Sequence, residues 1–419
     1  MAAGNFQASV ASQIEFVRPE LEQLMMLSSR LWSRITTRTD IKAVSGRPAR
    51  IPFEALSGGK FRAANPDGGD LGRGSGPIEV NGSLSCVFFT QVSEYTAQAE
   101  WTTDGDEKAI KNYVTLTNQR STETMAGYFD ATFQGDGSNT LDSVVSTGTA
   151  NAYVVNNANF FQDGQDLDVW SALGGTFRGT VTIESVDIAN NTIWLTGPQA
   201  TGSTAGDLLL VSGSAGVANS GLAGLRAYQV SGNAGTYMGV SRSAYPGKFS
   251  TPGFAANGSL TPALVRALEA QIKLAIGIDR ADQGDLVAHC NVDMEAAWEN
   301  NAILVQRVIM NEVKGDQSVD MLKRNAPTQI AGREMLVNER AAPGLIDFIA
   351  LKHWFRIEVK PLDYYEVGGQ TVYPVYGASG GIATSMLFAF VSELQTANAQ
   401  PRMGAFMSAV SIPPKYFGH

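Results

Sequence analysis

Residues 50–90 read RIPFEALSGGKFRAANPDGGDLGRGSGPIEVNGSLSCVFFT, and this stretch decides the fold. Arg50–Glu54 and the segment from Ile78 through Trp101 have the composition of extended strands. Between them, residues 58–76 hold seven glycines. Two long strands joined by a glycine-rich tip predict a long hairpin. Because its tip has too few apolar residues to build a core, we expect this hairpin to lie against another surface.

Helical patterns flank the hairpin on both sides. Before it, apolar residues from Ile14 to Leu31 recur at spacings of three and four, which predicts an amphipathic helix over 13–34. After it, Asp104, Asp106 and Glu107 precede a second run that lasts to about Phe133. Acidic side chains near the start suit the helix dipole. This run predicts a helix of about 45 Å at 1.5 Å per residue.

The excess negative charge is concentrated in residues 135–224. This segment has one basic residue, Arg178, and eight acidic residues, which gives it a net charge of −7. The formal net charge of all 419 residues is −9. Turn signals separate five short candidate strands in it. These candidates are Ala152–Val155, Asp166–Trp170, Thr180–Asp187, Thr192–Thr196 and Asp207–Val211. The segment therefore predicts a small β-barrel or sandwich inserted into a host domain.

The last part of the chain mixes helices and strands. Thr261-Pro262 begins a predicted helix, Asp285–Cys290 is a predicted strand, and Asp293 is a candidate N-cap of a second helix over 293–310. Later strands are predicted around Phe355–Lys360 and at the C-terminal end. These last two are Met386–Val391 and Ala405–Ser411.

Composition excludes several classes of protein. Charged residues make up 17% and apolar residues 44%, so the chain can bury a core and is not globally disordered. Its longest apolar run, Met386–Val391, is far shorter than the ~20 residues that span a bilayer, and no signal peptide is visible. Two cysteines, Cys86 and Cys290, provide no disulfide framework. We therefore expect a soluble chain made in a reducing cytoplasm, without contact to a membrane.

Short motifs do not combine into a catalytic site. Gly377–Gly381 matches GxSxG, but no Asp follows Ser379, and the only His after it is the terminal His419. Ser57–Lys60 matches SxxK within the hairpin tip. The acids at 163, 166 and 168 lack the glycine and the terminal glutamate of a calcium loop, so they are interpreted as turn residues. We expect no enzymatic activity, no metal and no cofactor.

The order of these parts resembles the major capsid protein of tailed bacteriophages with the Hong Kong 97 (HK-97) coat fold. The resemblance implies an α+β fold with an N-terminal arm at 1–45, an extended E-loop hairpin at 46–103 and the spine helix of the P-domain at 104–134. The insertion domain would be 135–224, and the A-domain with the remaining P-domain strands 225–419. It also implies copies that form the pentamers and hexamers of an icosahedral head around double-stranded DNA.

The same resemblance implies which residues contact neighbours. The tip of the E-loop, which would lie against a neighbouring copy, would comprise Gly58, Gly59, Lys60, Gly68, Gly69, Gly72, Gly74 and Gly76. The N-arm cations would contact scaffold, neighbours or genome, or else form a solvated helix end; they are Arg30, Arg34, Arg38 and Lys42. Some family members cross-link their shells through an E-loop lysine. Lys60 is the candidate here, but no motif for its partner is present, so we expect no cross-link.

The resemblance implies further partners as well. A separate scaffolding protein is expected, together with a portal and a decoration protein, and packaged DNA would lie close without sequence-specific binding. Two alternatives remain open: an encapsulin-like compartment shell, and a β-rich tail or adhesin protein that binds carbohydrate. A hydrolase that uses Ser379 is a third reading, which the missing acid opposes.

Overall fold

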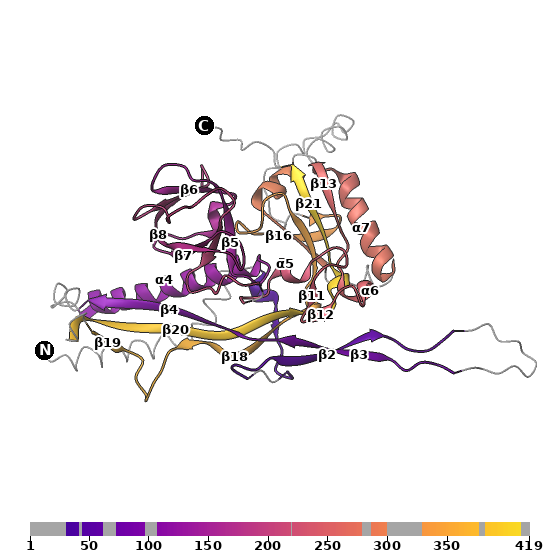
Figure 1. Ribbon diagram of the computed structural model, residues 1–419, viewed down its shortest axis with the longest axis horizontal. Coiled ribbons are helices and arrows are strands. Elements are labelled where there is room, and N and C mark those ends of the chain that lie inside the picture. Colours follow the sequence, from indigo (N-terminus) through magenta and orange to yellow (C-terminus); the bar gives the residue numbers. More distant parts are fainter. Residues whose placement is uncertain are drawn as a thin grey trace, which may run out of the picture.

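The computed structural model describes residues 31–41, 44–61, 73–96, 107–218, 220–278, 286–299, 329–376 and 382–411. Within these ranges a flat platform carries two lobes, and a two-stranded ribbon extends from it (Figure 1). Most of the helix expected over 13–34 lies outside the described residues. Its end is Trp32–Arg34 (η2), a short 3-10 helix.

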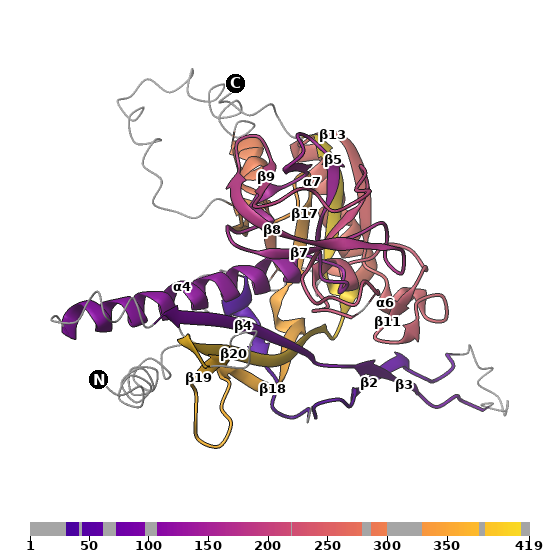
Figure 2. The same cartoon turned by 60° about the vertical axis from the view of Figure 1, so that its left-hand side comes forward.

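The platform is a five-stranded sheet with one long helix on it. The sheet has the order β1-β18-β20-β19, with β4 paired to the other side of β20. Its strands are β1 (Thr36–Thr37), β4 (Val87–Thr96), β18 (Trp354–Tyr364), β19 (Tyr373–Tyr376) and β20 (Ile382–Asn398). The helix is α4 (Glu107–Phe133), the predicted spine helix, and it lies along β4 in both views (Figures 1 and 2). Phe89 of β4 packs on Phe129 of α4 with ring centroids 5.0 Å apart.

The ribbon consists of β2 (Ala49–Leu56) and β3 (Ile78–Leu84), which pair antiparallel from Ala49↔Leu84 to Leu56↔Ile78. The prediction that the hairpin continues through the following strand is wrong. The chain leaves the ribbon after Leu84, at the end of β3. The strand that follows is β4, and it pairs with β20 instead. The pairing partner lies some 300 positions later in the chain, so local sequence carried no signal for it.

The first lobe is a closed six-stranded barrel with the order β10-β5-β6-β9-β8-β7. Its strands are β5 (Thr140–Ser146), β6 (Ala152–Val155), β7 (Asp166–Trp170), β8 (Phe177–Asp187), β9 (Thr192–Leu195) and β10 (Leu208–Val211), and η3 (Ala158–Phe160) connects β6 to β7. The predicted inserted β-domain is therefore confirmed as a barrel. Five strands were predicted close to their observed bounds, and β5 was missed.

The second lobe is a six-stranded mixed sheet with the order β13-β21-β17-β14-β16-β15. Its strands are β13 (Gly253–Ser259), β14 (Leu286–Cys290), β15 (Gln329–Ile330), β16 (Arg333–Val337), β17 (Ile346–Ala350) and β21 (Ala405–Ser411). Helix α7 (Pro262–Ile276) covers the sheet through Val265, Leu268 and Ile272. Its N-cap is Thr261, whose hydroxyl accepts a hydrogen bond from the Leu264 amide at 3.4 Å.

The second predicted helix begins earlier than expected. Residues 292–299 are helical, and the rest of the predicted range lies outside the described residues. Asn291, rather than the predicted Asp293, is the N-cap, because its side-chain oxygen accepts from the Asp293 amide at 3.3 Å. Short elements complete the fold: α5 (Leu225–Tyr228), β11 (Thr236–Tyr237), β12 (Val240–Ser241), α6 (Pro246–Phe249), η5 (Leu351–His353) and η6 (Pro401–Met403).

A search of the described helices finds none that is both long enough and apolar enough to cross a bilayer.

Candidate assembly surfaces

The base of the ribbon is anchored in the chain's own core. Along β2, buried and exposed residues alternate from Ala49 to Leu56, so one face of the ribbon packs inward. Phe53 contacts the rings of Tyr237 and Phe249, with centroids 5.5 and 6.1 Å away. The Ser83 amide also donates to the Met238 carbonyl at 2.8 Å. The hairpin expected to lack any core of its own therefore shares that of the platform, up to the end of β2.

Beyond Leu56 and Ile78 the ribbon has no such support from the described residues. The Gly59 amide donates to the Ser75 carbonyl at 2.7 Å, and Phe61 is fully exposed. Gly58 has φ +70°, and a Cβ atom there would lie 2.6 Å from the Pro77 nitrogen, so only glycine fits. Lys60, Gly74 and Gly76 are also exposed, whereas Gly68, Gly69 and Gly72 lie outside the described residues.

Two of the four N-arm cations have partners within the chain. Arg34 holds the Glu334 carboxylate through two hydrogen bonds of 2.6 Å. Arg38 donates to Asp40 at 2.9 Å and lies over the Phe355 ring, and its guanidinium lowers the pKa of the Asp40 carboxyl. Arg30 and Lys42 lie outside the described residues. The chain's own carboxylates thus engage the two described arm cations.

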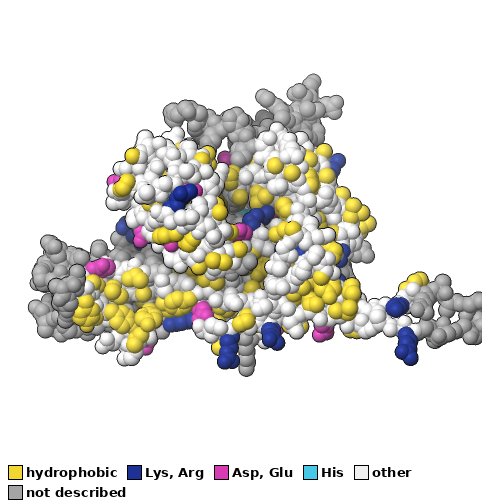
Figure 3. Space-filling model, viewed as in Figure 1, with side chains coloured by type: hydrophobic (Ala, Val, Ile, Leu, Met, Phe, Trp, Pro, Cys, Tyr) yellow, Lys and Arg dark blue, Asp and Glu magenta, His cyan; other side chains and the backbone are white. Residues whose placement is uncertain are grey.

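One face of β4 carries exposed apolar side chains. Phe88 and Val92 are 54% and 62% exposed, and they alternate with Phe89 and Ser93, which face α4. Figure 3 shows hydrophobic side chains over the part of the surface where β4 and β20 lie. No strand of the described ranges pairs with the outer edge of β4. A long unpaired edge beside exposed apolar residues is typical of a surface that another chain covers.

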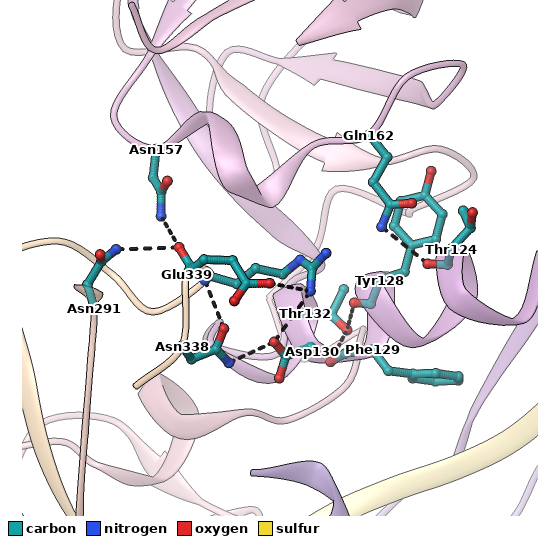
Figure 4. Close-up of polar contacts among 11 residues, drawn as sticks. Thr124, Tyr128, Phe129, Asp130, Thr132, Asn157, Gln162, Asn291, Asn338 and Glu339 are labelled. Atoms are coloured by element: carbon teal, nitrogen blue, oxygen red, sulfur yellow. Dashed lines mark hydrogen bonds and ion pairs between the residues drawn. The ribbon is translucent and has the colours of Figure 1, made fainter. Parts of the chain in front are cut away.

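A polar junction joins the barrel to the second lobe. Asn157 of the barrel and Asn291 beside β14 both donate to the Glu339 carbonyl oxygen at 3.4 Å (Figure 4). They also donate to the Ala341 carbonyl oxygen, at 3.3 and 2.8 Å respectively. The same loop reaches the platform, because Asn338 donates to Asp130 of α4 at 2.7 Å. The loop at 338–341 therefore contacts the barrel and the second lobe through two backbone carbonyls, and α4 through one side chain.

A second contact fixes the barrel to α4 directly. The side-chain amide of Gln162 donates to the Thr124 carbonyl at 3.3 Å (Figure 4). Gly127 allows this approach, since a Cβ atom at that position would lie 2.2 Å from the Gln162 Nε2 atom. Sequence reasoning found none of these junction residues, because each contact joins segments that are far apart in the chain.

The residues weighed for chemistry lie apart in ordinary structural settings. Asp163, Asp166 and Asp168 accept hydrogen bonds within the barrel from Val186, Thr182 and Thr180 respectively. No group of three metal-ligating side chains comes together among the described residues. Gly377–Gly381 and His419 lie outside the described part of the chain.

The cysteines are poor nucleophiles. Burial raises the pKa of the Cys86 thiol to about 11 and that of Cys290 to about 12, so both remain protonated near neutral pH. His289 is fully buried, and neither ring nitrogen has a hydrogen-bond partner among the described residues.

No protein-family model matches the chain. No curated protein is significantly similar to it. Among solved structures, a capsid protein in the asymmetric unit of cyanophage A-1(L) is similar with a TM-score of 0.54 at 12% identity, covering 91% of this chain and 93% of that one. The capsid of a native GTA particle has a TM-score of 0.44 at 10% identity, covering 91% and 90%. The SrpI encapsulin of Synechococcus elongatus PCC 7942 has a TM-score of 0.42 at 9% identity, covering 93% and 91%.

The similarity to the cyanophage capsid protein extends over nearly the whole length of both chains. Platform, spine helix, extended ribbon and second lobe together form the HK-97-like capsid fold, as predicted, with the barrel inserted after α4. At this level of identity the comparison establishes the fold.

Proposed function

We propose that the chain is the structural major capsid protein of a tailed bacteriophage. In this proposal its copies assemble into the pentamers and hexamers of an icosahedral head that encloses double-stranded DNA. The observation that carries the proposal is the ribbon, whose base is anchored in the core while its outer part and Phe61 are exposed. Such an arm gains contacts only from a neighbour. The fold that the chain shares with a capsid protein supports the same function.

The proposed contacts run from the ribbon of one copy to the body of the next. Head-to-tail contacts of this kind are heterologous, and they close into rings when the rotation between copies divides a full turn. The glycines of the proposed tip can adopt more than one backbone geometry, which rings of five and of six both require. A charge near zero outside residues 135–224 lets large surfaces approach with little desolvation of charged groups.

We further propose the partners that a phage head needs. These are a separate scaffolding protein, a portal and a decoration protein, with assembly in the host bacterial cytoplasm and the virion as the final location. Packaged DNA would lie close to the shell, in proximity that is not sequence-specific and without strong binding, because strong binding of phosphates requires an excess of Lys and Arg. The chain has 31 basic against 40 acidic residues. The role is structural, with no enzymatic step.

Electron microscopy of the purified protein tests the proposal. Closed icosahedral shells, formed by the chain alone or with a scaffolding protein, are the expected result. Trimeric fibres would favour the tail or adhesin alternative, and monomers at high concentration would contradict assembly. Shells that co-purify with an enzyme cargo and without a portal would favour the compartment alternative. Uniform shells formed by this chain alone would show that no scaffold is needed.

The same particles test the expectation for Lys60. A denaturing gel of boiled, reduced shells should show one band at 44.6 kDa. A ladder of larger bands that disappears in a Lys60→Arg variant would show covalent cross-linking through the ribbon.

A further inference from the structure

A polar pocket of about 550 Å³ lies between the base of the ribbon and the C-terminal end of α7, the helix that covers the second lobe. Residues of β2, α6 and η6 form most of its walls. Helix α6 lies beside the ribbon base in both views, and its Phe249 packs on the ring of Phe53 of β2 (Figures 1 and 2). The volume falls within the range of roughly 300–1,000 Å³ that is typical of small-molecule sites.

Three basic side chains from separate segments line this pocket. Arg38 follows β1, Lys248 belongs to α6, and Arg402 belongs to η6. Glu54 of β2 is the one acidic residue of the lining. The pocket therefore has an excess of positive charge, although the formal net charge of the whole chain is −9.

Each of the three cations has a donor that its own chain does not use. Asp40 accepts from the Nε and Nη2 atoms of Arg38, and this leaves the Nη1 atom. Arg402 donates through Nη2 to the Ala275 carbonyl in the last turn of α7, and this leaves Nε and Nη1. The Lys248 ammonium has no hydrogen bond or ion pair within the described part of the chain. The remaining donors are therefore available to a ligand.

The chemistry of these donors defines the ligand. Guanidinium and ammonium groups offer N–H donors and no acceptor, so the ligand must be an anion with several oxygen atoms. Arginine holds phosphate through paired hydrogen bonds, and lysine binds it as a point charge. A single carboxylate has one charge and two oxygens, which are too few for cations from three segments. Linked phosphate groups have enough of both.

The shape of the site favours a small anion over nucleic acid. A DNA duplex carries its phosphates on a convex surface, whereas this pocket is a hollow enclosed by the ribbon base and the end of α7. We propose that the pocket binds a small anion with linked phosphate groups, held by Arg38, Lys248 and Arg402. Bound there, the anion would join the base of the ribbon to the end of α7. The proposal does not depend on the shell function, because all these residues belong to one copy.

The first test is titration calorimetry of the unassembled full chain with sodium pyrophosphate at constant ionic strength. We expect one site per chain, with an affinity at least tenfold lower in Lys248→Met and in Arg402→Met. Lys248→Met is the sharper variant, because its ammonium has no partner to lose among the described residues. Lys352→Met is the matched control, since Lys352 is exposed and lies outside the pocket, and it should bind like the wild type. No binding by the wild type, or equal affinity in every variant, would overturn the proposal.

Melting curves give a second readout. A ligand that binds the folded state raises its melting temperature, so pyrophosphate should stabilise the wild type and Lys352→Met but not Lys248→Met. Phosphate salts also stabilise proteins because they are excluded from the surface, so the difference between the variants is the quantity that decides. A rise of equal size in Lys248→Met would contradict a site at this pocket.

A competition experiment separates the two sources of phosphate. A short DNA duplex of mixed sequence should leave pyrophosphate binding to the wild-type chain unchanged. Displacement of pyrophosphate by the duplex would assign the pocket to the DNA backbone and overturn the small anion as its ligand.

Discussion

The ribbon and the barrel are both made of antiparallel strands, but the barrel has no unpaired edge strand, whereas both strands of the ribbon are edge strands. In the barrel every strand has two neighbours, and its one basic residue, Arg178, pairs with the buried Asp207 at 2.7 Å. The ribbon has two strands, two open edges and an exposed outer part. A closed barrel completes its hydrogen bonds alone, while an open ribbon requires partners. The comparison teaches that stability and assembly are assigned to different parts of one chain.

The largest expected effect comes from removing the outer ribbon. Joining Leu56 to Ile78 through Asn-Gly keeps the paired residues of β2 and β3 and supplies a favourable two-residue turn. Shells should disappear from electron micrographs. The melting temperature of the chain should stay within about 2 °C, since the described residues of the outer ribbon do not pack into the core and such changes alter stability by under ~0.5 kcal/mol.

The matching change in the barrel is a shorter turn between β8 and β9. Replacing the exposed residues 188–190 with Asn-Gly shortens this turn and keeps Asn191, whose oxygens accept from the Val155 and Ala158 amides, and shells should persist. Shells from the ribbon variant, or their loss from the barrel variant, would break the division between the two regions.

Phe53 and Phe61 separate the two halves of the ribbon itself. Phe53→Ala removes a ring that packs on Tyr237 and Phe249, and it should lower the free energy of unfolding by about 3–5 kcal/mol. Phe61→Ala removes a fully exposed ring and should leave the unfolding curve unchanged while reducing assembly. Urea denaturation of the unassembled chains measures the first effect. Equal losses of stability in both variants would show that the outer ribbon packs on its own chain.

Acid should weaken the second lobe and spare both ribbon and barrel. His289 lies opposite Asp347 of β17, which pairs with Arg226. Burial, together with Arg226, lowers the pKa of His289 to about 3, against an ordinary value of about 6.5. The unfolded chain therefore binds the extra proton, and stability falls as the pH drops from about 6.5 toward 3. Burial also raises the pKa of Asp347 above its ordinary value of 3.8. As the pH falls toward 3.8, the folded chain binds a proton at Asp347 more readily than the unfolded chain does, and this opposes part of the loss of stability.

His289 binds one proton, and this limits how steeply the free energy of unfolding can change with pH. The slope from His289 is at most about 1.4 kcal/mol per pH unit, and His289→Leu should remove it. Denaturation curves of both chains at pH 7, 5.5 and 4.5 measure the difference. Parallel losses in the two chains would place the acid-sensitive group elsewhere.

The smallest expected effect is that of Arg34→Ala. Arg34 and Glu334 form an exposed ion pair with side chains 39% and 36% exposed, so its loss should cost under about 1 kcal/mol. Because Arg34 is engaged within its own chain, shells should still form at the wild-type protein concentration. A loss of shells with a normal unfolding curve would instead assign Arg34 to a contact with a neighbour or a scaffold.

Local patterns in the sequence were sufficient for the elements that depend on near neighbours. The bounds of β6 and β7 match their predicted ranges, because alternation and turn residues define them locally. Strand β5 was missed because Asp142 interrupts its apolar pattern. In the structure its carboxylate accepts from the amides of Asn156 and Asn157, a role that only the folded barrel shows.

Features that join distant segments could not be predicted. Strand β20 is 17 residues long where six were predicted, since β4 on one side and β18 and β19 on the other extend it. The junction at Asn338 and the pocket with Lys248 and Arg402 likewise combine residues from separate segments. Among the proposed tip residues, Gly58 is one whose requirement for glycine only the structure explains, through its positive φ and the close approach of Pro77.

The closure of the barrel has a consequence for engineering. Its first and last strands are neighbours, with Thr140 paired to Leu210, so the polypeptide enters and leaves the barrel at adjacent points. Any compact domain whose two ends lie as close together can replace residues 140–211 without redirecting α4 or the chain that follows. The insertion point thus offers a place to attach one foreign domain to each copy of the chain.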